Sequence, residues 1–162
     1  MKKFTVGLVL VFGIIVSQGV TASAQRSVVG YWKTGGLGMI NEVNTTTGQT
    51  KNNRGKTFSY KFAADGTYTF VGYMESTMFG CTTSLFNEIN GRYLVDGTTI
   101  FLKPARDFWK NTYSCFPNSN RSQEKDPTQK SVEFGFKTDE YGKSFICLND
   151  GGVETCYRRE QE

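Results

Sequence analysis

Three Asp-Gly dipeptides, each lying between two runs of strand-forming residues, constrain the fold of this chain more than any other feature. They are Asp65-Gly66, Asp96-Gly97 and Asp150-Gly151. Asp-Gly flanked by alternating hydrophobic residues is typical of a tight β-hairpin, because the turn requires positive φ and glycine adopts it without steric cost. No segment shows a sustained helical period. Three hairpins in one short chain therefore predict an antiparallel all-β fold built from neighbouring strands.

The first of these hairpins predicts which side chains share a face of the sheet. A three-residue loop at 64–66 places Phe62 opposite Tyr68. The same loop places Tyr60 opposite Phe70, so the bulky aromatic side chains gather on one face. A two-residue loop would scatter them over both faces. We therefore expect the three-residue form.

The later hairpins extend this face. At Asp96-Gly97 we expect a two-residue loop with Val95 opposite Thr98 and Tyr93 opposite Ile100. For the strand that follows 131–138, two alternatives stay open: Phe145 and Cys147 facing inward, or Ile146 and Leu148. The candidate interior, which could line a ligand site, consists of Tyr60, Phe62, Tyr68, Phe70, Met74, Tyr93, Ile100, Phe134 and Phe136.

The same patterns give a map of strands over the whole chain. Strands are expected at 28–34, 57–63, 67–75, 78–86, 89–95, 98–103, 107–115, 131–138, 143–149 and 153–159, and near 37–44. One aromatic face and one polar face suit a closed up-and-down barrel or a sandwich, since either limits exposed sheet edges. The polar connections 35–55 and 116–130 are interpreted as solvated loops or as the rim of a binding site.

The first 24 residues have the pattern of a signal peptide. Lys2 and Lys3 precede an apolar run of about 13 residues, and Ala22-Ser23-Ala24 offers a cleavage site. We therefore expect cleavage near Ala24, one domain over 25–162, and a secreted or periplasmic protein. Without the two lysines the net charge falls from +4 to +2, which does not indicate nucleic-acid binding, and no cysteine near the cleavage site could carry a lipid membrane anchor.

All four cysteines lie after this segment, and an even number in an exported chain predicts two disulfides. If Gly151-Gly152 form the turn, Cys147 faces Cys156 at a non-hydrogen-bonded position, where the two Cα atoms are about 4.5 Å apart. Cys81 and Cys115 then pair with each other. Their spacing does not resemble a zinc site, so no metal is expected.

The chain contains no histidine. Histidine is the usual general base near neutral pH and the usual ligand of zinc and haem, so Ser-His-Asp and Cys-His catalysis are excluded. The acidic residues are scattered, and many occupy turns where Asp forms local hydrogen bonds. We therefore expect a protein that is not an enzyme and that uses no cofactor.

Residues at the two ends of the predicted domain resemble those of the bacterial lipocalin-like branch of the calycin superfamily. Gly30-Tyr31-Trp32 is similar to the Gly-x-Trp opening of these barrels, and Arg158 or Arg159 matches the basic residue that covers this tryptophan and closes the barrel. The resemblance spans about residues 28–159. It implies an up-and-down β-barrel of about eight to ten strands, stabilised here by disulfides.

The resemblance also implies a small apolar or amphipathic molecule held in the barrel mouth, with the 35–55 connection at its border. An eight-stranded barrel either holds one small ligand or is filled by its own side chains. In the filled case, the alternative function is inhibition of an extracellular or periplasmic protease through surface loops. The protein partner in that case is unknown.

Overall fold

The computed structural model describes residues 28–36 and 54–161, and over these ranges the fold is all-β. The strands are β1 (Gly30–Gly36), β2 (Arg54–Phe62), β3 (Thr67–Met78), β4 (Cys81–Asp96), β5 (Thr99–Tyr113), β6 (Arg121–Lys125), β7 (Lys130–Thr138), β8 (Ser144–Asp150) and β9 (Val153–Glu160). A single 3-10 turn covers Pro117–Ser119. The predicted signal peptide and the expected strand near 37–44 lie outside the described residues.

The strands form one antiparallel sheet that closes into a ring. Strands next to each other in the chain pair from β1 to β5 and from β7 to β9, while β9 pairs with β1 and β7 with β5. Strand β6 stands outside the ring, beside the second half of β5. The predicted antiparallel all-β fold is thus confirmed, and so is its closure.

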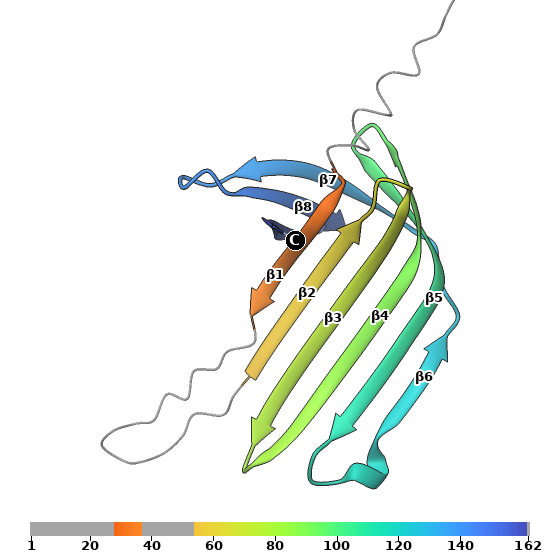
Figure 1. Ribbon diagram of the computed structural model, residues 1–162, viewed down its shortest axis with the longest axis vertical. Helices are drawn as coiled ribbons and strands as arrows, with labels where there is room; N and C mark the ends of the chain where they lie inside the picture. The colour runs from red at the N-terminus through yellow and green to blue at the C-terminus, as the bar shows by residue number, and fades with distance from the viewer. Residues whose placement is uncertain (1–27, 37–53, 162) are drawn as a thin grey trace, which may run out of the picture.

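The ring consists of a large part, formed by β1 to β5 with β6 beside them, and a small part, formed by β7 to β9. Figure 1 shows long strands β2 to β5 running side by side, with β7 and β8 crosswise to them near one end. The apolar side chains of the buried core cluster lie where the two parts face each other. They are Val28, Trp32, Tyr60, Phe62, Tyr68, Tyr93, Val95, Ile100, Leu102, Val132, Ile146, Leu148 and Tyr157. The second halves of β3 and β5 and the first half of β4 extend beyond this core together with β6.

The hairpin at Asp65-Gly66 has the predicted register. Phe62 lies opposite Tyr68, and Tyr60 lies opposite Phe70. The Asp65 carboxylate accepts hydrogen bonds from the backbone nitrogen of Thr67 at 2.9 Å and from its hydroxyl at 2.6 Å. This local network fixes the turn, and it leaves the aromatic side chains on the inner face.

The register predicted for the next hairpin was wrong by two residues. Val95 lies opposite Ile100, and the turn residues are Gly97 and Thr98 instead of Asp96 and Gly97. A shift of two residues leaves every side chain on its own face, because side chains alternate with a period of two. The hydrophobic pattern therefore could not distinguish the two registers, and Ile100 is buried in either.

Strands β4 and β5 are each continuous where the sequence predicted two shorter strands. Pro104, expected to end a strand, lies within β5 opposite Gly91, where the register shifts. A Cβ atom on Gly91 would lie 2.4 Å from the carbonyl oxygen of Lys103, so only glycine allows this close approach. The irregularity accommodates the proline and lets both strands continue. Strand β6 was not predicted, since its five residues are polar and all exposed.

Both predicted disulfides are present. Cys81 bonds to Cys115 with their Cα atoms 5.4 Å apart, and Cys147 bonds to Cys156 with theirs 3.9 Å apart. The Cys147–Cys156 bond lies on the outer face of the small part of the ring. Consequently Ile146 and Leu148 face inward, which settles the alternative that the sequence left open.

Candidate functional site

A cleft of about 490 Å³ opens at one end of the ring, where β1 ends and β2 begins. Its walls come from both parts of the ring. Its apolar lining includes Phe58, Tyr60, Phe70, Val132, Leu148 and Tyr157. The volume falls within the range of roughly 300–1,000 Å³ that is usual for small-molecule sites.

Aromatic rings form one wall of the cleft. The ring of Tyr60 lies 4.8 Å from that of Phe70 and 5.3 Å from that of Tyr157, measured between centroids. Phe58 stacks on Phe70 at 6.2 Å. These contacts hold the rings in fixed positions, so the wall is formed without a ligand.

Two phenol hydroxyls in this wall have no hydrogen-bond partner among the described residues. Tyr60 and Tyr157 contribute them, and both residues are buried. Burial raises the pKa of Tyr60 far above its ordinary value, and the neighbouring Tyr157 adds to the effect. Burial also raises the pKa of Tyr157 to about 12. Both groups stay neutral near pH 7 and can donate to, or accept from, a polar atom of a ligand.

Charged side chains border the cleft. Lys130 forms an ion pair with Asp150 at 2.7 Å. Lys56 also lines the cleft, is exposed, and has no ion pair within the described part of the chain. Among the described residues, Lys56 is therefore a rim cation that no carboxylate neutralises.

The candidate interior residues divide between the cleft and the packed core. Tyr60 and Phe70 line the cleft, whereas Phe62, Tyr68, Tyr93 and Ile100 lie in the packed region. The Tyr93 hydroxyl donates to the carbonyl oxygen of Ala63 at 2.9 Å, away from the cleft. Phe134 packs partly buried against the core, and Met74 and Phe136 are exposed.

Several cleft residues were not among the predicted candidates. They include Phe58, Lys56, Lys130, Asp150 and Tyr157. Phe58 could have been found, because the register that pairs Tyr60 with Phe70 also turns Phe58 inward. Tyr157 could not, since nothing in the sequence shows which face of the last strand is buried.

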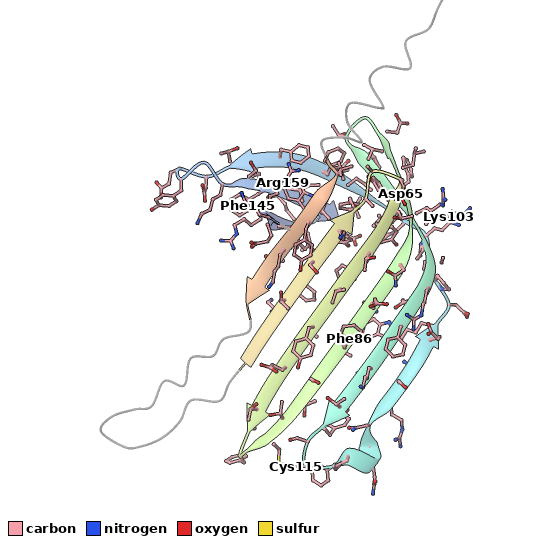
Figure 2. The ribbon with its side chains drawn as sticks, in the orientation of Figure 1. Asp65, Phe86, Lys103, Cys115, Phe145 and Arg159 are labelled. Atoms are coloured by element: carbon pink, nitrogen blue, oxygen red, sulfur yellow. A yellow bond between two sulfur atoms is a disulfide. The ribbon has the colours of Figure 1, made fainter. Side chains whose placement is uncertain are left out.

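Trp32 packs at the base of the ring, between the two parts. It is 1% exposed, and its Nε1 donates to the carbonyl oxygen of Val28 at 2.8 Å. The guanidinium carbon of Arg159 lies 5.2 Å from the Trp32 ring centroid, and its Nη2 donates to the carbonyl oxygen of Val29 at 3.1 Å. Figure 2 shows Arg159 where the two parts meet. Arg158 instead pairs with Glu160 on the outside.

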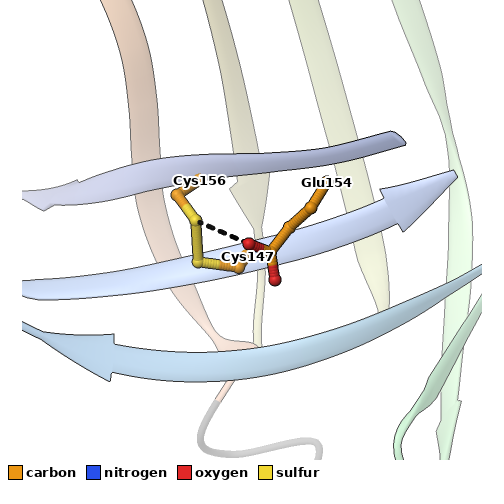
Figure 3. Close-up of side chains that lie close together, drawn as sticks. All are labelled: Cys147, Glu154 and Cys156. Atoms are coloured by element: carbon orange, nitrogen blue, oxygen red, sulfur yellow. Dashed lines mark hydrogen bonds between the residues drawn. A yellow bond between two sulfur atoms is a disulfide. The ribbon is translucent and has the colours of Figure 1, made fainter. Parts of the chain in front are cut away.

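One group of residues has the composition of a metal site. Cys147, Glu154 and Cys156 lie together, and the Glu154 carboxylate is 3.9 Å from the Cys156 sulfur (Figure 3). Both sulfurs belong to the disulfide, so neither is a thiolate ligand and neither carries a hydrogen to donate. Glu154 also pairs with Lys137 at 2.7 Å. The group is therefore a disulfide beside a surface ion pair.

Comparison with protein-family models, curated proteins and solved structures finds no match to this chain. Within the described residues, no helix is long and apolar enough to cross a membrane. Two disulfides are consistent with an oxidising extracellular or periplasmic compartment. The case for a function therefore rests on the cleft.

We expect the protein to lose stability as the pH rises above about 10. Burial raises the pKa of Tyr60, Tyr68 and Tyr157 in the folded state, the latter two to about 12. The unfolded chain ionises its tyrosines first, so their contribution is complete below the unfolded pKa and disappears as the pH rises through the folded values. Urea midpoints measured across this range should fall. Tyr60→Phe should flatten the fall, and Tyr141→Phe, at a residue 78% exposed, should not.

Proposed function

We propose that this protein is a non-catalytic, exported binding protein that holds a small amphipathic molecule in the cleft. The observation that carries the proposal is a preformed apolar cleft of about 490 Å³ with Lys56 at its rim, a cation that forms no ion pair with another described residue. The pairing of Trp32 with Arg159 supports the resemblance to lipocalin-like barrels. The apolar body of the ligand would lie against Phe58 and Phe70.

The polar groups of the cleft favour a ligand with an anionic head. Lys56 is available for a charge-assisted hydrogen bond, while Lys130 is already paired with Asp150. The hydroxyls of Tyr60 and Tyr157 can satisfy a second polar atom deeper in the cleft. A carboxylate on a hydrocarbon chain matches this arrangement better than a pure hydrocarbon, which would leave both hydroxyls buried and unpaired.

We expect saturable, micromolar binding of a fluorescent fatty acid. Lys56→Glu should weaken it about tenfold or more, because a charge-assisted hydrogen bond is lost. The neutral alcohol analogue of the same probe should bind both proteins alike. Thr155→Phe, which adds a ring to the lining of the cleft, should weaken both probes. Fluorescence titration measures each affinity.

The matched control is Lys103→Glu, which makes the same change of charge outside the cleft. Figure 2 shows Lys103 at the outer side of the long sheet. An equal loss of affinity in the two glutamate variants would contradict the proposed role of Lys56. Absence of saturable binding by either probe, together with inhibition of a secreted protease, would favour the inhibitor alternative.

A further inference from the structure

The turn between β3 and β4 has an unusual residue for its geometry. Phe79 and Gly80 form a two-residue turn, and both have positive φ, 51° and 78°. Phe79 is the one residue other than glycine with positive φ in the described part of the chain. Such turns favour asparagine, aspartate or glycine, because a bulky side chain is strained there.

No packing against the described residues compensates for the strain at Phe79. Its side chain is 96% exposed. Elsewhere the chain follows the rule, since the turns after β2 and β8 are formed by Asp65-Gly66 and Gly151-Gly152. Phe79 departs from this turn preference although its side chain is exposed and the strain lowers stability. Such a departure indicates that the side chain has a function.

The turn is held firmly at the far end of the long sheet. Cys81, two residues after Phe79, is bonded to Cys115, and Figure 2 shows Cys115 at this end. The backbone nitrogen of Thr82 donates to the Ser114 hydroxyl at 2.7 Å, and that of Ser114 donates to the carbonyl oxygen of Thr82 at 2.9 Å. The two loops therefore form one unit.

Two further exposed apolar side chains belong to the same unit. Met78 is 45% exposed, and Phe116, next to the disulfide, is 68% exposed. We call Met78, Phe79 and Phe116 the apolar tip. Because the disulfide fixes both loops, the tip meets a partner with little loss of backbone entropy.

The charged residues behind the tip are all basic. The segments 76–87 and 108–123 contain no Asp or Glu. They do contain two cations, Lys110 and Arg121. The Arg121 guanidinium donates to the carbonyl oxygens of Asn118 and Asn120 at 2.9 and 2.8 Å, which holds it against the loop of the tip. The remaining polar residues of the two loops are neutral.

We propose that the apolar tip docks the protein on an anionic phospholipid surface. The three apolar side chains would enter the interfacial region, with Arg121 near the headgroups and no carboxylate within 76–87 or 108–123 to be repelled. A protein groove that takes an extended strand fits less well, because the turn at Phe79 is not extended. The docking does not depend on the proposed function of the cleft.

Flotation of the purified protein with phosphatidylcholine vesicles, with and without phosphatidylglycerol, tests the proposal. We expect binding to the anionic vesicles that weakens with added salt. Phe79→Asn should weaken this binding about tenfold or more. The same variant should unfold at a higher temperature, because asparagine suits the turn. Phe79→Trp should bind, with indole fluorescence shifted to the blue.

Two control variants separate this site from the rest of the molecule. Tyr141→Asn removes an aromatic side chain that is 78% exposed on the loop between β7 and β8, and it should leave vesicle binding unchanged. Lys56→Glu should also leave it unchanged, so failure of the cleft proposal and failure of this one are distinguishable. Vesicle binding by Phe79→Asn equal to that of the wild type would overturn the proposal. Failure of the wild type to bind vesicles would also overturn it, even if Phe79 were then found to bind a protein.

Discussion

Replacing Trp32 with alanine is expected to lower the free energy of unfolding by about 3–5 kcal/mol. The side chain is 1% exposed and packs between the two parts of the ring, so its removal leaves a cavity that neither part can fill. The hydrogen bond from Nε1 to Val28 and the contact with Arg159 are lost with it. Urea unfolding followed by the fluorescence of Trp109 measures the change.

Trp32→Phe gives the graded comparison. It keeps an aromatic ring but loses the hydrogen bond, so we expect the free energy of unfolding to fall by about 1–2 kcal/mol. Tyr141→Ala, at an exposed position, should change the free energy of unfolding by less than about 0.5 kcal/mol. A loss of under about 1 kcal/mol for Trp32→Ala would contradict the place of this residue in the core.

Removing the Cys81–Cys115 disulfide is expected to lower the free energy of unfolding by about 3–4 kcal/mol. The bond joins residues 34 apart, so it removes much conformational entropy from the unfolded chain. Neither cysteine is buried, so serine can replace both with little loss of packing. The double variant Cys81→Ser with Cys115→Ser should therefore report mainly on the cross-link, measured by urea unfolding against the wild type.

The Cys147–Cys156 disulfide provides the comparison. Its residues are 9 apart, so by the same loop-closure argument its removal should lower the free energy of unfolding by about 2.5 kcal/mol. Cys147 is buried, and replacing it with alanine instead of serine avoids adding a buried polar group. Equal stability of the wild type and the Cys81–Cys115 variant would mean that the long sheet is held by its strand pairing alone.

The sequence predicted most where local chemistry and packing agreed. At Asp65-Gly66 the turn residues and the aromatic pattern required the same register, and that register is present. At Asp96-Gly97 two registers buried the same residues, so the pattern could not choose between them. Strand β6 has no apolar residue and follows only from pairing with β5, which sequence patterns do not report.

The cleft was harder to predict than the fold. Sequence patterns show that Tyr60 and Phe62 face inward, but only the crossing of the two parts shows that Tyr60 lines a cleft while Phe62 is packed. The interior is filled by side chains around Trp32 and has a cleft near Lys56. The strained turn at Phe79 was also missed, since Phe-Gly is not a usual turn dipeptide.

The ring closes at two short seams. The first four residues of β5 pair with β7 over Lys130–Glu133, and β9 pairs with β1 at Tyr31–Lys33. Local opening needs least free energy where few backbone hydrogen bonds break, so these seams can part while the strand pairing within each part of the ring stays intact. The walls of the cleft come from both sides of the seams, with Phe58 and Phe70 on one and Leu148 and Tyr157 on the other. Breathing of the ring would thus widen the cleft and let a ligand enter between two folded halves.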